Sequence, residues 1–343
     1  MVFSQSAISR EEVEEAMSIQ ELIKKPLTSV PQRYIQLHNN EPSLLAGETF
    51  SHALPTINLK KLIHGEDIEL ELEKLTSACR DWGFFQLVEH GISSVVMKTL
   101  EDEVEGFFML PMEEKMKYKV RPGDVEGYGT VIGSEDQKLD WGDRNILELY
   151  IEELQNLAMI LMGLLGKTLK IEKRELEVFE DGIQNMRMTY YPPCPQPELV
   201  MGLSAHSDAT GITILNQMNG VNGLQIKKDG VWIPVNVISE ALVVNIGDII
   251  EIMSNGAYKS VEHRATVNSE KERISVAMFF LPKFQSEIGP AVSLTNPEHP
   301  PLFKRIVVEE YIKDYFTHNK LNGKSYLEHM RITDDEKFTN ASI

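Results

Sequence analysis

The spacing of hydrophobic residues divides the chain into a mainly helical first part and a second part made of short strands. Between residues 68 and 82, apolar side chains recur every three to four positions, which is typical of a helix with one buried face. The same period covers residues 145–169 and predicts the longest helix of the chain. From Met186 onward, short β-branched runs alternate with Gly, Asn and Asp, which predicts strands joined by turns.

Shorter segments fill in this pattern. Residues 54–59 and 84–88 are predicted strands, and residues 94–109 are a predicted helix with Ser94 as its N-cap. A last helical segment covers residues 308–330. The strand-like runs of the second part are GITILNQ, GLQIKK, GVWIPVN, ALVVNIGDIIEIM and RISVAMFFL.

Helices do not alternate with these strands, so the pattern favours a β-sandwich or barrel over a parallel sheet. We therefore predict a mainly β fold with flanking α-helices, in which a jelly roll is backed by the N-terminal helices. We place the division at residue 170. Residues 1–170 form the helical and mixed region, and residues 171–343 form the jelly-roll core with the C-terminal helix.

The charge of the chain argues against two classes of partner. The net charge is −18, with 52 acidic and 34 basic residues spread along the 343 positions. Such a surface repels phosphate backbones and anionic lipids, so we expect no binding to nucleic acid or membranes. The two cysteines, Cys79 and Cys194, form no disulfide or metal-binding pattern. Since the N-terminus also lacks the features of a targeting peptide, we expect a cytoplasmic protein.

A histidine and an aspartate lie two residues apart in the stretch LSAHSDATGITIL, residues 203–215. On an extended strand His206 and Asp208 point to the same side, and His263 in KSVEHRATV is the best candidate for a third ligand from a neighbouring strand. Two histidines and one carboxylate form the facial triad of non-haem Fe(II) sites. For such a pair alone, a buried histidine hydrogen-bonded to an aspartate is the usual explanation, so the pair does not decide by itself.

A second motif follows ten residues after His263. In the predicted strand RIS, Arg273 and Ser275 lie on one face. A guanidinium binds a carboxylate through two hydrogen bonds, and a nearby hydroxyl can bind a second oxygen of the same anion. A structural surface arginine would account for Arg273 alone, but not for its place after a candidate iron ligand.

Together these motifs resemble the plant 2-oxoglutarate and Fe(II)-dependent dioxygenases. The resemblance rests on HSD at 206–208, EHR at 262–264, RIS at 273–275 and YYPPCPQP at 190–197. It extends to ACRDWGFFQLVEHGI, FFMLPMEEKMKY and EGYG in the first part of the chain. The segments SEDQKLDW, GLQIKKDG and LNGKSYLEHMRI are most similar to the branch that contains thebaine and codeine O-demethylases and senescence-related dioxygenases.

The resemblance implies a double-stranded β-helix and a set of site residues. It implies that iron is bound by His206, Asp208 and His263, and that the distal carboxylate of 2-oxoglutarate is bound by Arg273 and Ser275. Tyr191 would add a hydroxyl donor, although packing on the neighbouring prolines is an alternative. Thr189 stands where many relatives have an asparagine that reaches the cosubstrate.

The resemblance also implies the remaining partners. Phe279 stands where relatives place an aromatic side chain against the substrate, with a plain core position as the alternative. Tyr326, Leu327 and Met330 form either a lid or ordinary helix packing. The cofactors would be Fe(II), 2-oxoglutarate as cosubstrate and ascorbate as reductant. The partners would be O2 and a small aromatic molecule, and we expect a monomer.

The implied activity is hydroxylation or oxidative O-demethylation of an aromatic plant specialised metabolite, an alkaloid or a phenolic, with release of succinate and CO2. Two alternatives are an Fe(II) oxidase of the same fold that uses no keto acid and a catalytically silent ligand-binding homologue. Production of succinate separates the first alternative from the leading hypothesis.

The chain departs from the family pattern after Asp143. Relatives have roughly two dozen further residues before the long helix, whereas here RNILELY follows at once. Either the segment is deleted or the sequence omits it between residues 143 and 144, and we expect an omission. An intact mass of 38.9 kDa would exclude an omission.

Overall fold

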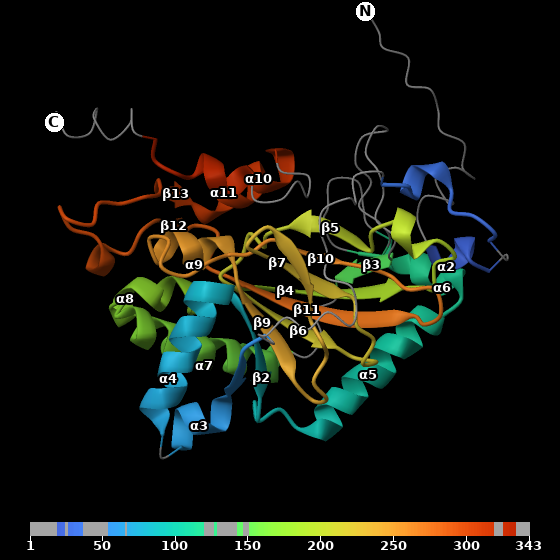
Figure 1. Cartoon of the computed structure of the whole chain (residues 1–343), viewed down its shortest axis with the longest axis horizontal. Coiled ribbons are helices and arrows are strands. Elements are labelled where there is room, and N and C mark those ends of the chain that lie inside the picture. The colour runs from blue at the N-terminus through green and yellow to red at the C-terminus, as the bar shows by residue number, and fades with distance from the viewer. Residues whose placement is uncertain are drawn as a thin grey trace, which may run out of the picture.

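Two β-sheets form the centre of the computed structural model, with helices around them (Figure 1). The structure describes residues 19–24, 27–36, 54–65, 67–119, 127–128, 143–146, 151–318 and 325–333. The larger sheet has the strand order β1-β2-β9-β6-β11-β4-β3. β1 and β2 are parallel, and all the other neighbours are antiparallel. In sheet order these strands are Thr56–Asn58, Phe84–Val88, Leu242–Ile246, Ile212–Gln217, Arg273–Leu281, Ile183–Tyr191 and Asp143–Ile146.

The smaller sheet is antiparallel and has the order β5-β10-β7-β8. These strands are Leu203–His206, His263–Ala265, Leu224–Lys228 and Val231–Pro234. β12 (Glu287–Ile288) and β13 (Ile306–Val307) form a separate pair. The mainly β fold with flanking helices is confirmed, and the two sheets are consistent with the predicted jelly-roll core.

Helices cover one face of the larger sheet. The main hydrophobic core contains side chains of α4 (Ile68–Ser77), α5 (Ser94–Met109) and α7 (Ile151–Leu169) together with side chains of β6, β9 and β11. The other helices are α2 (Ile19–Leu22), α3 (Leu59–His64), α6 (Met112–Lys115), α8 (Lys173–Leu176), α9 (Asp248–Met253), α10 (Val308–His318) and α11 (Ser325–His329).

Alternation along β11 separates the core from the functional side of the sheet. Four apolar residues of this strand belong to the main core, and they are Ile274, Val276, Met278 and Phe280. The alternate residues of the strand, among them Arg273 and Ser275, face the opposite side of the sheet. The larger sheet therefore buries its helix-covered face and presents polar groups on the other.

The predicted start of the long helix is wrong. Residues 145 and 146 belong to β3, which pairs with β4 and crosses the junction after Asp143 without a break, and α7 begins at Ile151. Residues 147–150 lie outside the described part of the chain. Strand pairing overrides the helical pattern of this segment. The edge of β4 has backbone N–H and C=O groups that need partners, and β3 supplies them.

Three further boundaries differ from the prediction. The apolar run ALVVNIGDIIEIM is half strand and half helix, because β9 ends at Ile246 and α9 begins at Asp248. All six residues of α9 are buried, and a segment buried on every side shows no period.

Ser93, not Ser94, caps α5, since its Oγ accepts a hydrogen bond from the Val95 amide at 3.2 Å. The last helical segment is divided into α10 and α11, and residues 319–324 lie outside the description.

Candidate functional site

The candidate iron ligands meet where the smaller sheet ends. β5 ends at His206, and the antiparallel register places His263 of β10 directly opposite it. Asp208 lies in the loop after β5, so a turn and not strand alternation brings it back towards the histidines. Its Oδ1 is 3.5 Å from the Nε2 atom of each histidine. All three side chains are buried, and their ligand atoms lie within 4.8 Å of one another.

Backbone carbonyls orient both imidazole rings. The Nδ1 atom of His206 lies 2.8 Å from the Ser204 carbonyl oxygen, and that of His263 lies 3.1 Å from the Val261 carbonyl oxygen. A carbonyl can only accept, so Nδ1 carries the proton and Nε2 keeps its lone pair towards the other ligands. The rings of Phe84 and His263 pack edge to face, with their centroids 5.2 Å apart. Both rings are thus fixed in the tautomer that suits metal binding.

Two neutral side chains hold the carboxylate of Asp208. Its Oδ2 accepts a hydrogen bond from Thr213 Oγ1 at 2.6 Å and another from Asn245 Nδ2 at 2.8 Å. Thr213 of β6 and Asn245 of β9 are direct neighbours in the larger sheet. The prediction from sequence missed both residues. Because Thr213 and Asn245 both bind Oδ2, the Oδ1 atom of Asp208 points at the two histidines.

The charges of this cluster favour a cation. Burial alone would raise the pKa of Asp208, but His263 and His206 outweigh burial and hold it well below its usual range. Burial, together with the neighbouring His263, lowers the pKa of His206. For His263, burial is outweighed by the Asp208 carboxylate, which raises its pKa. Two imidazole nitrogens and one anionic oxygen in a buried cluster are a donor set that fits non-haem Fe(II).

The candidate residues for the keto acid lie on the same side of the larger sheet. Arg273 is paired with Tyr191, and Ser275 lies between Thr189 of β4 and Gln217 of β6. The Arg273 side chain donates from Nη1 to Ser275 Oγ at 3.3 Å, and its guanidinium carbon lies 5.1 Å from the centre of the Tyr191 ring. The structure therefore brings together all four residues that the resemblance assigned to the cosubstrate.

Arg273 is buried, with 2% of its surface exposed. It forms no ion pair with a residue in the described part of the chain, and its Nε and the Gln217 Nε2 are buried donors without an acceptor there. A buried cation and two buried N–H donors without an acceptor are costly unless an anion binds to them. The site thus fits a carboxylate such as the distal one of 2-oxoglutarate.

Comparison with known proteins identifies the family. Residues 182–282 match the 2OG-Fe(II) oxygenase superfamily, and residues 54–157 match the N-terminal region of non-haem dioxygenases in morphine synthesis. The chain belongs to the 2OG-Fe(II) oxygenase superfamily. It is an Fe(II)/2-oxoglutarate-dependent dioxygenase.

Similar curated proteins carry related activities in their names. The oxygenase is 46% identical to codeine O-demethylase of Papaver somniferum, over 92% of this chain and 96% of that protein. It is 44% identical to oxoglutarate-dependent flavonoid 7-O-demethylase 1 of Ocimum basilicum, over 93% and 91% of the two chains. The crystal structure of JOX2 in complex with 2OG, Fe and JA matches with a TM-score of 0.83 and 35% identity, over 92% of this chain and 97% of that one.

Gln217 is a further residue that the prediction from sequence missed. Its Oε1 accepts a hydrogen bond from Arg273 Nη2 at 3.1 Å, and it lies opposite Ser275 in the sheet. In the oxygenase it is therefore part of the same polar group as Arg273. Its spacing of four from Thr213, with both polar residues on one face of a predicted strand, was the only signal in the sequence.

The predicted substrate residue lies on the same face as these groups. Phe279 pairs with Thr213 and is half-buried, and its ring lies 5.2 Å from the guanidinium carbon of Arg187. Its strand neighbour Thr213 donates a hydrogen bond to Asp208, so one residue of the sheet lies between Phe279 and an iron ligand. Tyr326, Leu327 and Met330 are buried in the main core, as ordinary packing would require.

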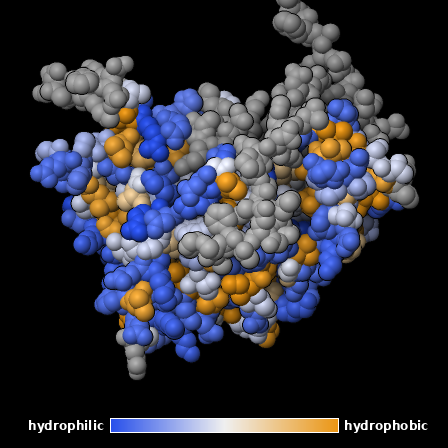
Figure 2. Space-filling view, in the orientation of Figure 1, coloured by the Kyte–Doolittle hydropathy of each residue, from blue (hydrophilic) through white to orange (hydrophobic). Residues whose placement is uncertain are grey.

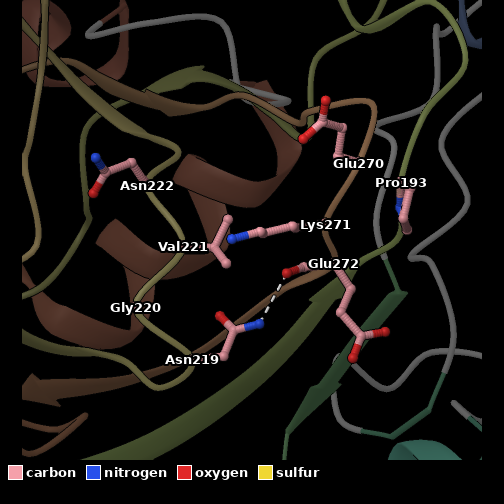
Figure 3. Close-up of a pocket in the computed structure, with 8 residues that line it drawn as sticks. All are labelled: Pro193, Asn219, Gly220, Val221, Asn222, Glu270, Lys271 and Glu272. Carbon is pink, nitrogen blue, oxygen red and sulfur yellow. Dashed lines mark hydrogen bonds between the residues drawn. The ribbon is translucent and has the colours of Figure 1, made fainter.

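The surface has a hollow near β11 and a mixture of hydrophilic and hydrophobic residues. A hollow of about 600 Å³ lies just before β11, and Figure 3 shows its eight lining residues with the hydrogen bond from Asn219 Nδ2 to the Glu272 carbonyl oxygen. None of the eight is a candidate ligand of the iron or the keto acid. Hydrophilic and hydrophobic residues are mixed on the face shown in Figure 2. In the described residues, no helix is both long and apolar enough to cross a membrane.

Proposed function

We propose that the oxygenase hydroxylates or O-demethylates a small aromatic plant metabolite, an alkaloid or a phenolic, and releases succinate and CO2. One observation carries this proposal: the buried cluster of His206, Asp208 and His263 lies on the same side of the larger sheet as the buried Arg273. The link is Thr213, which contacts Asp208 and lies on the same face as Ser275. A metal and a carboxylate bound there would be neighbours.

Each residue has a role in this proposal. His206, Asp208 and His263 hold the iron, and Arg273, Ser275 and Tyr191 hold the distal carboxylate of 2-oxoglutarate, with Thr189 beside them. When bound, iron and keto acid supply the oxidation, in which O2 gives one oxygen atom to succinate and the other to a C–H bond of the substrate. The protein orients both molecules and excludes water. We propose ascorbate as the reductant that keeps iron in the Fe(II) state.

The substrate class is inferred from the relatives and from the site. Two of the relatives are named as O-demethylases of an alkaloid and of flavonoids. Phe279 offers an aromatic ring on the same face of the larger sheet as Thr213, which contacts Asp208, and aromatic rings pack well against one another. Hydroxylation of an O-methyl carbon yields a hemiacetal, which breaks down to a phenol and formaldehyde.

The test is a substrate panel of methoxylated flavones and methoxylated alkaloids, supplied with Fe(II), ascorbate and 2-oxoglutarate. We expect succinate in step with substrate loss, and formaldehyde where an O-methyl group is removed. Succinate with a hydroxylated product and no formaldehyde would show hydroxylation. Product formation without keto acid would favour the oxidase alternative, and no turnover on any member would favour the silent homologue.

Asp208→Ala is the matched control. It removes the only carboxylate of the cluster, so we expect turnover to fall to background. Unchanged product formation in this variant would refute the assignment of the iron ligands.

We also propose a cytoplasmic monomer. Both cysteines are buried and free, which suits a reducing compartment. Fractionation of the source cells tests the cytoplasmic location. Light scattering of the purified chain tests the monomeric state.

A further inference from the structure

Ser207 lies between the two iron ligands His206 and Asp208. A helix from the far end of the chain, α10, holds it in place. Ser207, between His206 and Asp208, is fully buried. Its carbonyl oxygen accepts a hydrogen bond from the Tyr315 hydroxyl of α10 at 2.9 Å. Its own hydroxyl donates to Asp248 Oδ2 at 3.2 Å.

A second tyrosine of α10 reaches the same carboxylate. The Tyr311 hydroxyl donates to Asp248 Oδ2 at 3.1 Å. Tyr311 and Tyr315 are four residues apart, so they lie on one face of the helix. Burial and the Asp248 carboxylate raise the pKa of Tyr311 well above its usual range, so its hydroxyl stays a donor at neutral pH.

The start of α9 completes the contact. The backbone amides of Asp248 and Ile249 donate to the carbonyl oxygens of Asp208 and Thr210 at 2.8 and 3.0 Å. The loop that carries Asp208 is therefore fixed by α9, and α9 and Ser207 are in turn fixed by α10, which lies next to α9 in Figure 1.

We propose that Tyr311 and Tyr315 are positioning residues of the iron site. This inference rests on the proposed function, because it assumes that His206 and Asp208 bind the metal. Ser207 separates the two ligands, so its position sets the angle between their donor atoms. The tyrosines of α10 hold that position from outside the ligand set, as partners beyond the ligands do in other metal sites.

The test uses three variants of the full chain, each of which loses one hydroxyl. Tyr315→Phe and Tyr311→Phe remove the two donors. Tyr326→Phe is the control: its ring centre lies 5.2 Å from that of Tyr311, but its hydroxyl donates to Asp314 and not to Ser207 or Asp248. Co(II) titration in the presence of 2-oxoglutarate gives the dissociation constant and the visible absorption spectrum of the bound metal, and urea unfolding gives the stability.

We expect the dissociation constant for Co(II) to rise about tenfold in Tyr315→Phe, somewhat less in Tyr311→Phe, and to stay unchanged in Tyr326→Phe. The Co(II) spectrum should change in the first two variants only, which a mere loss of stability would not cause. Wild-type affinity and spectrum in Tyr315→Phe, or an equal change in Tyr326→Phe, would overturn the inference.

Other results of the same titrations would contradict the proposed function itself. If the wild-type chain bound no Co(II), or bound it equally well after Asp208→Ala, the ligand assignment itself would be wrong. Tight binding by the wild type, lost in Asp208→Ala and unaffected by the tyrosine variants, would overturn only the role of α10.

Discussion

At the scale of single residues, the candidate iron site depends on neutral groups as much as on its ligands. Thr213→Val keeps the shape of the side chain and removes the 2.6 Å hydrogen bond to Asp208. Of the two bonds to Oδ2 of Asp208, the one from Asn245 would remain, so Oδ1 would be less firmly directed at the histidines. We expect Fe(II) affinity to fall about tenfold, measured as the Fe(II) concentration that gives half-maximal turnover.

Thr76→Val is the control for this substitution, because the Thr76 hydroxyl donates to the Leu72 carbonyl within α4. Its Fe(II) dependence should match that of the wild type. If Thr213→Val matched it as well, the hydrogen bond would have no part in metal binding.

Gln217 gives a prediction for the cosubstrate. Gln217→Leu removes the acceptor of Arg273 Nη2 and a buried amide donor that has no acceptor in the described residues. Hydrogen bonds to charged groups contribute about 1.5–3 kcal/mol, so we expect 2-oxoglutarate to bind at least about tenfold more weakly. Calorimetric titration with 2-oxoglutarate in the presence of Mn(II) measures this, and Mn(II) binding alone should be unchanged. A wild-type affinity for 2-oxoglutarate would exclude Gln217 from the site.

These residues also mark the limit of prediction from sequence. Arg273 and Ser275 were predicted because a charge and a hydroxyl with a period of two stand out in an apolar strand. Thr213, Gln217 and Asn245 are neutral residues of ordinary strands, and their roles arise from pairing with strands far away in the sequence. No spacing along the chain shows this.

At the scale of elements, most strands were predicted, and the errors lie where burial or pairing hides the period. α9 is buried on all sides, and β3 continues a helical pattern but pairs with β4. The helical stretch predicted over residues 68–82, by contrast, ends where expected, because it is followed by Gly83, whose φ of +63° suits glycine best.

Gly83→Ala tests this turn. An added Cβ would lie 2.2 Å from the Lys259 carbonyl oxygen, in addition to the strain of the positive φ. Gly91 has a φ of +83° with nothing within 4 Å of the added atom, so Gly91→Ala shows the cost of the backbone conformation alone. We expect about 1–2 kcal/mol of destabilisation for Gly91→Ala and about 1–3 kcal/mol more for Gly83→Ala, measured by urea unfolding. Equal losses would mean that Lys259 moves away without cost.

At the scale of the whole molecule, the two regions divided at residue 170 share one sheet. β1, β2 and β3 come from the first region, and β4, β6, β9 and β11 come from the second. β2 pairs with β9 through four residues, among them Phe84 opposite Asn245. The first region also supplies α4, α5 and α7, which cover the apolar face of that sheet. The site residues therefore come almost entirely from the second region, while the first supplies much of the core that supports them.

From this arrangement we expect that residues 171–343 do not fold alone. Without β2 and α7, the edge of β9 and the apolar face formed by residues such as Ile212, Ile214 and Val276 would be exposed to water. The isolated fragment should be insoluble or unfold without a cooperative transition, and it should bind no Co(II). Co-expression with residues 1–170 should restore both properties if the shared sheet is the reason. A soluble fragment with a cooperative urea transition and Co(II) affinity of its own would show instead that the second region holds its site without the first.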